Sequence, residues 1–530
     1  MAAAALSGIL LYLAFPPFEF EETAWIALVP LLVALRHEED PRAAFRLGLI
    51  AGSVFWIASI EWLRRVTVVG WLVLAVYCAL YLAAFALAAR AWLGRLGHER
   101  AALNLGFMAY SATAWAGLEW FRSTFATGFA WNPLAVSQYR NPALLQAAAW
   151  GGAYAVSALI VFINAGIALT VLRYISRQGR WGRRPHIEMM LAFLVLAVAF
   201  WAGARRVRGL SDGPVELRVA LIQPAIPQDE KWDSEKVSLI YGRLEELTRA
   251  AHRAGPLDLI IWPETALPDD VRYSQSSYDL VYSLCSLGSP ILVGSMDSEW
   301  PEDRKPIYFN SSFLFDSQGR VVERYDKQHL VLFGEYVPLQ DALPFLRAMT
   351  PIQESFTPGT NATVFHLENP RVAFSVLICF EDTVSHLARR AVRKGARLLI
   401  NQTNDAWFDP SSASRQHMAQ CVLRVVETGV PALRAANTGV SCWINRRGVV
   451  AAELRDASGN TIFPGFLNVA ARPAPEDLPL TFYTRYGDVI PVSAGSVALA
   501  VFFLLTRRLG AIANQCGDNR AEAVHGAGGD

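Results

Sequence analysis

One cysteine occupies a position suited to a reactive thiol. Residues 372–378 form a continuous apolar run that ends at Cys379, and Glu381 and Asp382 follow within three positions. A free cysteine is commonly an inert core residue, whereas a catalytic thiol needs a nearby base and a cation or backbone donor for the oxyanion that it creates. The adjacent acids favour Cys379 as a nucleophile.

A carboxylate and an ammonium that would serve such a thiol occur in two earlier segments. The apolar run 257–261 is followed by Pro263 and presents Glu264, which alone would more often be a surface residue after a turn. Lys327 and Glu335 lie in an apolar and aromatic loop, where burying either charge alone costs several kcal/mol. They predict a charged pair, either a structural salt bridge or part of an active site.

The elements that must position these side chains are short strands. Glu264, Lys327 and Cys379 lie in a region from about 216 to 479 where charged residues return and short β-rich runs alternate with helical ones. This alternation indicates an α/β domain, and such domains usually gather their sites at strand ends. We therefore expect three distant segments to meet in one pocket.

Apolar stretches flank this region on both sides. We place them near 3–15, 24–36, 44–62, 70–92, 103–121, 147–172, 188–204 and 489–506. Because a helix needs about 20 apolar residues to cross a bilayer, the first two are short, and tilted spans, a re-entrant hairpin or a signal peptide at 1–16 are the alternatives. The sequence predicts a multi-span α-helical membrane protein with an inserted α/β domain.

The placement of arginine predicts the orientation. Basic residues in short loops favour the cytoplasmic side. With the N-terminus inside, the opposite loops hold only Arg64, Arg65, Arg122 and Arg140, whereas the cytoplasmic loops hold most of the arginines that flank spans: 36, 42, 46, 90, 95, 100, 173, 177, 180, 183, 184, 507 and 508. The asymmetry places the inserted domain outside the cytoplasm.

Composition excludes other classes of protein. The net charge of +1 implies no acidic polymer as a partner, and without zinc spacing or a basic aromatic stripe we expect no nucleic acid. The six cysteines are scattered, which argues against a disulfide framework or a metal cluster. We expect no metal, no cofactor and a monomer.

Several segments resemble one family in order along the chain. Glu264, Lys327 and Cys379 match the Glu, Lys and Cys triad of the nitrilase superfamily, and the longer sequence resembles apolipoprotein N-acyltransferases. Other matching segments are 13–18, 223–232 with Gln228, Lys231 and Trp232, 333–338, 403–408 and 434–439. The ordered set covers nearly the whole chain except its tail and is specific, although each motif alone would be weak.

The resemblance implies an α-β-β-α sandwich of the nitrilase type and a two-step acyl transfer. Cys379 would attack a phospholipid ester, usually of phosphatidylethanolamine in this family, and the resulting thioester would acylate the α-amino group of the diacylglyceryl-cysteine of an apolipoprotein. Glu264 would act as general base. Lys327 and the backbone N–H of Phe380 would stabilise the oxyanion, and Glu335 would orient Lys327 or relay a proton.

The resemblance also implies a substrate pocket and a cellular setting. Trp232, Phe380, Glu381 and Trp407 match positions that shape the acyl and substrate pocket in the family. The expected domains are a bundle of seven spans at 1–205, an extracytoplasmic catalytic domain at 206–485, a final transmembrane helix at 486–508 and a disordered cytoplasmic tail at 509–530. The protein would be multi-pass in the bacterial inner membrane, with its catalytic domain on the periplasmic side.

Two other functions fit parts of this pattern. A membrane-anchored nitrilase-type amidase would keep the triad and accept water, and a catalytically silent scaffold would bind lipoproteins. Three positions differ from the usual family pattern: Phe380 stands for Tyr, Leu332 for Pro and Asp409 for Gly. Because the triad is intact, these differences bear on substrate preference and rate more than on reaction class.

Overall fold

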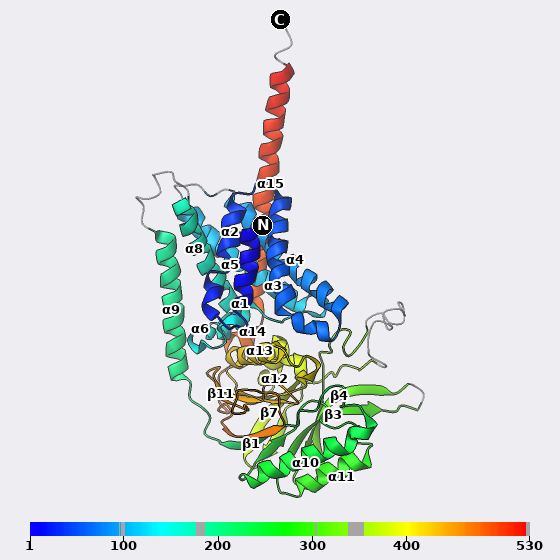
Figure 1. Cartoon of the computed structure of the whole chain (residues 1–530). Helices are drawn as coiled ribbons and strands as arrows, with labels where there is room; N and C mark the ends of the chain where they lie inside the picture. The colour runs from blue at the N-terminus through cyan, green and yellow to red at the C-terminus, as the bar shows by residue number, and fades with distance from the viewer. Residues whose placement is uncertain (95, 97–100, 176–185, 303–304, 338–354, 526–530) are drawn as a thin grey trace.

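The chain folds into a helical bundle that stands on an α/β sandwich (Figure 1). The computed structural model describes residues 1–94, 96, 101–175, 186–302, 305–337 and 355–525, with side chains as far as 507. Several arginines used to predict the orientation, at 95, 100, 177, 180, 183 and 184, lie outside these residues, as does residue 338 of one matching segment.

A helix occurs at every predicted apolar stretch. These helices are α1 (Ala2–Leu13), α2 (Val29–Arg36), α3 (Pro41–Ser59), α4 (Val68–Leu93), α5 (Ala101–Thr124), α8 (Ala153–Ile175), α9 (Ile187–Gly209) and α15 (Val489–His525). In the described part of the chain, only α4, α8, α9 and α15 are long and apolar enough to cross a membrane. Of the eight predicted membrane spans, four are therefore supported by helix length and composition. Helices α1 and α2, with 12 and 8 residues, are too short to cross a bilayer alone.

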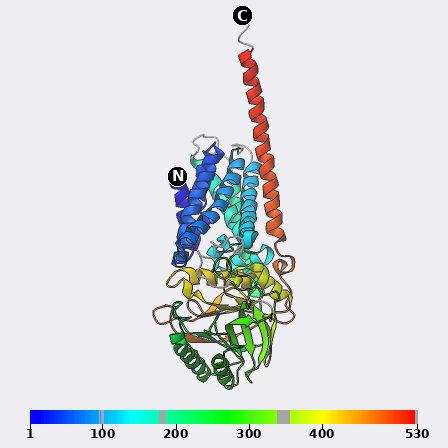
Figure 2. The ribbon, with the colours of Figure 1, turned by 90° about the vertical axis from the view of Figure 1, so that its right-hand side faces the viewer.

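Two helix ends differ from the prediction. Helix α9 continues to Gly209, so the first residues assigned to the catalytic domain are helical. Helix α15 runs along the edge of the bundle and extends beyond it to His525, so most of the segment predicted as a disordered tail is helical backbone (Figures 1 and 2). Residues 526–530 lie outside the described residues.

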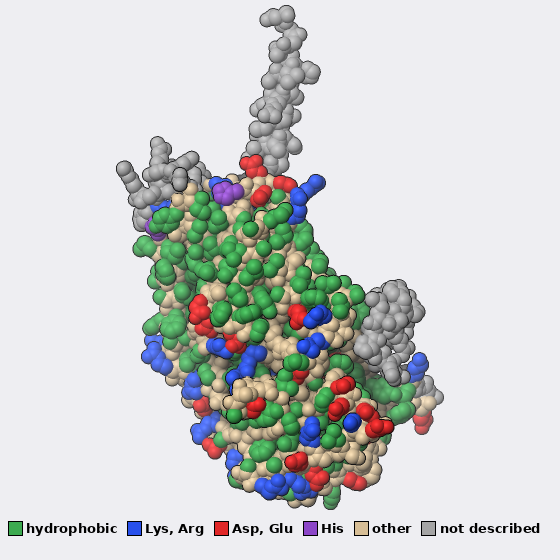
Figure 3. Space-filling model, viewed as in Figure 1, with side chains coloured by type: hydrophobic (Ala, Val, Ile, Leu, Met, Phe, Trp, Pro, Cys, Tyr) green, Lys and Arg blue, Asp and Glu red, His purple; other side chains and the backbone are tan. Residues whose placement is uncertain are grey.

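Small residues allow the bundle helices to approach closely. A Cβ added at Gly52 of α3 would lie 2.8 Å from the Cα of Ala79 on α4, and one at Gly117 of α5 would lie 2.3 Å from the Cα of Gly495 on α15. Without a hydrophobic driving force between helices in lipid, such close van der Waals packing holds the helices together. On the face shown in Figure 3, hydrophobic side chains cover most of the bundle, whereas charged side chains are more frequent on the sandwich.

The sandwich consists of two six-stranded sheets. The first has the order β12-β1-β2-β3-β4-β5 and the second β11-β10-β9-β8-β7-β6, with parallel pairs at the centre and antiparallel pairs at the edges. The strands are β1 (Leu217–Gln223), β2 (Leu259–Ile261), β3 (Ile291–Glu299), β4 (Ile307–Phe315), β5 (Val321–Asp326), β6 (Phe365–Glu368), β7 (Arg371–Ile378), β8 (Leu398–Thr403), β9 (Ala432–Ala436), β10 (Cys442–Ile444), β11 (Val450–Glu453) and β12 (Gly465–Ala471).

Helices cover the outer face of each sheet. Helices α10 (Val237–Arg253) and α11 (Gln275–Cys285) pack on the first sheet, and α12 (Ser385–Arg393) and α13 (Ala413–Thr428) lie between the second sheet and the bundle (Figure 1). One hydrophobic cluster joins α12 and α13 to the bundle, and another fills the space between the sheets. The predicted fold, a membrane bundle with an inserted nitrilase-like α/β sandwich, is confirmed.

Candidate active site

Three strand ends bring the predicted triad together. Glu264 follows β2, Lys327 follows β5 directly, and Cys379 follows β7 directly. The Lys327 Nζ lies 3.3 Å from Glu264 Oε1, and the charges of both side chains act on the Cys379 thiol. The expectation that distant segments converge at strand ends is met for all three residues.

The Glu264 carboxylate is fixed at both oxygens. Asn310, on β4, donates its Nδ2 to Oε1 at 2.8 Å, and the backbone N of Asn404 donates to Oε2 at 2.9 Å. The residue after it, Thr265, has a φ of 41°, which side chains rarely adopt. Glu264 itself is only 7% exposed, so the orientation of its carboxylate is set by the protein rather than by water.

Glu335 completes a charged group around Lys327. Its Oε1 lies 2.8 Å from the Lys327 Nζ and also accepts from Asn310 at 3.1 Å, while its Oε2 accepts from the backbone N of Val331 at 2.9 Å. Burial alone would lower the pKa of Lys327, but Glu335 and Glu264 together raise that pKa well above its ordinary value. Lys327 is therefore a permanent cation in the site.

Cys379 sits on a strained backbone elbow at the start of η8 (Cys379–Thr383). Its φ is 52°, and its carbonyl oxygen accepts from Asn401 Nδ2 at 3.0 Å and lies 3.2 Å from His417 Nε2. Burial and the Glu264 carboxylate raise the pKa of the Cys379 thiol well above its ordinary value, although Lys327 opposes them. The resting side chain is therefore a thiol, which must lose its proton before it can attack.

A buried cluster of charged side chains lies next to the backbone elbow at Cys379. His417 lies 2.8 Å from Asp382 Oδ1 and 2.9 Å from Asp405 Oδ1, and Arg434 bridges the two aspartates at 2.9 and 2.8 Å. Burial and Arg434 lower the pKa of His417, but the aspartates outweigh them and raise it to about 9. With Arg434, the protonated histidine balances the negative charges of the two aspartates. Its Nε2 also lies near the carbonyl oxygen of Cys379.

Glu381, which is expected to shape the substrate pocket, is fully buried beside the nucleophile. Its carboxylate accepts four hydrogen bonds, from the backbone N of Ile378 at 2.8 Å, Gln328 at 2.7 Å and His329 at 3.0 Å and from the Tyr325 hydroxyl at 2.8 Å. With its oxygens occupied, Glu381 ties the segment after Lys327 to the Cys379 elbow.

The three aromatic residues predicted to bind substrate lie at different depths. Phe380 is half-buried, and its ring is nearly parallel to that of Trp131, with the centroids 6.1 Å apart. Trp131 precedes the bundle's η4 (Leu134–Gln138), so this contact joins the bundle to the residue beside the nucleophile. Trp232 and Trp407 are 48% and 43% exposed and are free to meet a ligand.

Sequence reasoning missed several residues that shape the site. Asn310, Asn401 and His417 had no role, and Lys231 was noted only as part of a matching segment, yet its Nζ donates to the backbone oxygen of Glu264 at 3.1 Å. One signal was available, because Asn310 and Asn401 each begin a run of three polar residues in a strand that starts with three apolar ones. His417 gave no such signal, since its partners come from distant segments.

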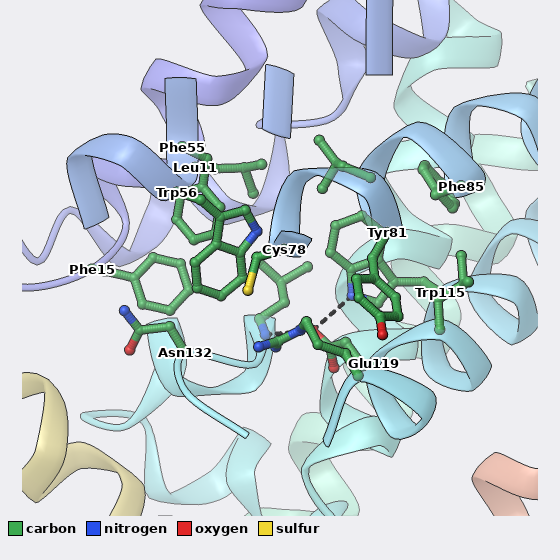
Figure 4. Close-up of a pocket in the computed structure, with 14 residues that line it drawn as sticks. Leu11, Phe15, Phe55, Trp56, Cys78, Tyr81, Phe85, Trp115, Glu119 and Asn132 are labelled. Atoms are coloured by element: carbon green, nitrogen blue, oxygen red, sulfur yellow. Dashed lines mark hydrogen bonds between the residues drawn. The ribbon is translucent and has the colours of Figure 1, made fainter. Parts of the chain in front are cut away.

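A small cavity lies within the bundle, apart from the triad residues (Figure 4). It is lined by residues of α1, α3, α4 and α5 with Phe15, Asn132 and Leu134, and Glu119 points into it with Trp115 donating to its Oε1 at 2.8 Å. Its volume of about 30 Å³ has room for a water or two. The space is too small for an acyl chain.

Two family models match consecutive parts of the chain. Residues 7–166 match the model of the apolipoprotein N-acyltransferase N-terminal domain, and residues 218–464 match the carbon-nitrogen hydrolase model. Among solved structures, an amidase of the nitrilase superfamily from Nesterenkonia AN1 is 21% identical with a TM-score of 0.34, covering 51% of this chain and 93% of its own.

Full-length relatives extend both matches. The apolipoprotein N-acyltransferase of Geobacter metallireducens is 36% identical, covering 95% of each chain. That of Brucella suis is 32% identical, covering 86% of this chain and 88% of its own, and that of Gloeobacter violaceus is 31% identical, covering 96% and 94%. With both family models matched in order and this identity sustained almost from end to end, the chain belongs to the apolipoprotein N-acyltransferase family.

Proposed function

We propose that the protein moves a fatty acyl group from a phospholipid to the α-amino group of the diacylglyceryl-cysteine of an apolipoprotein, through a thioester on Cys379. Membership of the family implies a lipid acyl donor and a lipoprotein acceptor. The observation that carries the finer proposal is the buried contact of Lys327 with Glu264, with both charges acting on the Cys379 thiol.

The first half-reaction forms the thioester. Glu264 takes the thiol proton while the Cys379 sulfur bonds to the ester carbonyl carbon of the phospholipid, and the negative charge passes to the carbonyl oxygen. Lys327 and the backbone N–H of Phe380 stabilise that oxyanion. The oxyanion collapses, the bond to the glycerol oxygen breaks, and this oxygen takes the proton from Glu264, which releases the lysophospholipid.

The second half-reaction consumes the thioester. The neutral α-amine of the acceptor attacks the thioester carbonyl carbon, and Glu264 takes a proton from the attacking nitrogen. Collapse of the second oxyanion breaks the carbon–sulfur bond, and the departing sulfur recovers the proton from Glu264. The products are the amide and the free Cys379 thiol, so the cycle consumes no cofactor.

The position of the site supports lipids as substrates. Each CH₂ of an acyl chain loses about 0.8 kcal/mol if it moves from the bilayer into water, so the site must open toward lipid. Exposed apolar residues are available at the junction of sandwich and bundle, among them Leu332 and Phe333 in the loop after Lys327 and Phe482 and Tyr486 of α14 (Phe482–Tyr486). A phosphatidylethanolamine donor and a dry pocket that protects the thioester fit this arrangement.

The charged ends of the helices support the proposed orientation. Arg36, Arg90 and Arg173 end helices α2, α4 and α8 on the side away from the sandwich, where the C-terminus also lies (Figure 1). Arginine at these ends supports a cytoplasmic location for that side. The catalytic domain would then face the periplasm, from a multi-pass position in the bacterial inner membrane.

The test uses the full-length protein in phospholipid vesicles with an acyl-labelled phosphatidylethanolamine and a synthetic diacylglyceryl lipopeptide. We expect label on the peptide amine and, without peptide, an acyl adduct on Cys379 by mass spectrometry. Cys379→Ala should lose both, whereas Cys285→Ala, at a buried thiol on α11, should keep both. Release of free fatty acid alone would indicate a hydrolase, and transfer by Cys379→Ala would refute the assignment.

A further inference from the structure

A second buried lysine lies behind the Glu264 turn. Lys231, in the segment between β1 and α10, is 3% exposed, and its Nζ donates to the backbone oxygen of Glu264 at 3.1 Å. Lys327 meets the carboxylate of the same glutamate at 3.3 Å. Glu264 is therefore held by one ammonium at its side chain and by another at its backbone.

Packing alone does not account for this lysine. Burying an ammonium costs several kcal/mol unless partners compensate, and the group carries three N–H donors. In the described residues, the Glu264 carbonyl is the one hydrogen-bond acceptor of the Lys231 Nζ, and no carboxylate lies within ion-pair distance of that ammonium. The ring of Trp232, whose centroid is 6.0 Å from the Nζ, gives a weak additional contact.

The charge balance around the triad favours a second cation, which Lys231 can supply. Glu264 and Glu335 both contact Lys327, so these three side chains carry two negative charges and one positive charge. Acyl transfer adds a tetrahedral oxyanion to this group. A nearby cation in a site from which water is excluded lowers the energy of that negative charge in the transition state.

We propose that Lys231 is a positioning residue of the acyl transfer, which fixes the Glu264 turn through its carbonyl and supplies the second positive charge of the site. This inference rests on the proposed function. Lys231 acts through Glu264 and through its field at Cys379, without contact with the reacting atoms.

The titration of Lys231 provides a way to observe this role. Burial lowers the pKa of Lys231 to about 8, against the opposing effects of Glu264 and Cys379. Those two groups face it from the ends of β2 and β7, and Lys327 lies beyond Glu264. The charge of Lys231 is thus lost as the pH rises through about 8, and the rate of thioester formation should fall with it.

The experiment compares Lys231→Met and Lys231→Arg with a control, Lys236→Met, at a partly exposed lysine nearby on the chain. Single-turnover acylation of Cys379 is followed from pH 6 to pH 10 in the full-length protein in vesicles, with thermal unfolding as a check of folding. We expect Lys231→Met to be about 10- to 100-fold slower at pH 7 and to lose the alkaline fall. Lys231→Arg, which keeps its charge throughout, should recover part of the rate and shift the fall to higher pH.

The outcomes separate this inference from the proposed function. An absence of acylation on Cys379 in the unchanged protein would refute the proposed function itself. If the unchanged protein acylates normally, a wild-type rate and pH profile in Lys231→Met would overturn the role of Lys231. Should Lys231→Met fail to fold, an alkaline fall that stays near pH 8 in Lys231→Arg would overturn it equally.

Discussion

Single side chains behind the triad set its geometry. Asn310 reaches both Glu264 and Glu335, and Glu335 joins Lys327 to the backbone of Val331. A neutral amide at position 335 would keep the shape of the side chain but lose the negative charge that holds the Lys327 ammonium in place. The position of Lys327 therefore depends on a residue that need not touch the substrate.

We predict that Glu335→Gln slows acylation of Cys379 by about 10- to 100-fold, because Lys327 loses one of its two carboxylate partners and shifts from the oxyanion. Single-turnover acylation measures the effect. Glu323→Gln, at an exposed position on β5, is the control and should keep the wild-type rate. Equal rates in both variants would show that Glu335 does not orient Lys327.

The residues that were predictable from sequence are those with local signals. Glu264 and Cys379 each come at or just after the end of an apolar run, and this pattern needs no knowledge of the fold. Glu381 was assigned to the substrate pocket from the family resemblance, and its hydrogen-bond donors could not be foreseen, since Gln328 lies 53 positions earlier in the chain. Lys231 has the same limitation, since its partner Glu264 lies on another element.

Helix α13 connects the membrane bundle to the nucleophile through two consecutive residues. Gln416 is fully buried and accepts hydrogen bonds from the indoles of Trp62 at 3.1 Å and Trp131 at 2.8 Å, both from the bundle. His417 reaches the carbonyl of Cys379 at 3.2 Å. A displacement of the bundle would therefore move the backbone elbow at Cys379.

We predict that the stability of the protein falls as the pH rises from 6.5 to about 9. The pKa of His417 is raised from its ordinary 6.5 to about 9, so its contribution is complete below 6.5 and is lost as the pH passes 9. The loss should be on the order of 3 kcal/mol, seen by thermal unfolding in detergent. His417→Gln should remove this pH dependence, and His366→Gln, at an exposed position on β6, should keep it.

The positions of the elements were easier to predict than their pairing. The helices follow the apolar stretches because hydrophobicity over a span is a local property. The order of the first sheet was not predictable, because β1 pairs with β12, where Leu217 lies opposite Ala471 at the far end of the domain. Such pairing depends on contacts that no short segment contains.

At the scale of the whole molecule, α15 is attached to the bundle by a glycine contact. We predict that Gly117→Ala lowers the thermal unfolding temperature, because the added Cβ would lie 2.3 Å from Gly495 and separate α5 from α15. Overpacking of this kind typically costs about 1–3 kcal/mol. Gly242→Ala on α10, where nothing lies within 4 Å, is the matched control and should not lower that temperature.

The orientation in the membrane gives a further prediction. A reporter active only in the periplasm should be active when fused within the catalytic domain, for example after Gly288 in an exposed turn, and inactive when fused after Arg507. The physical reason is the arginine at the helix ends away from the sandwich. The reverse pattern of activity would place the catalytic domain in the cytoplasm.

The helices α12 and α13 have the bundle, rather than solvent, on their outer side, and a single hydrophobic cluster runs through both. Cutting the chain to release residues 217–471 would leave that apolar layer uncovered, and exposed surfaces of this kind promote aggregation. Deleting the bundle alone is therefore not expected to yield a freely diffusing enzyme, because the surface that the bundle covers would first have to become polar.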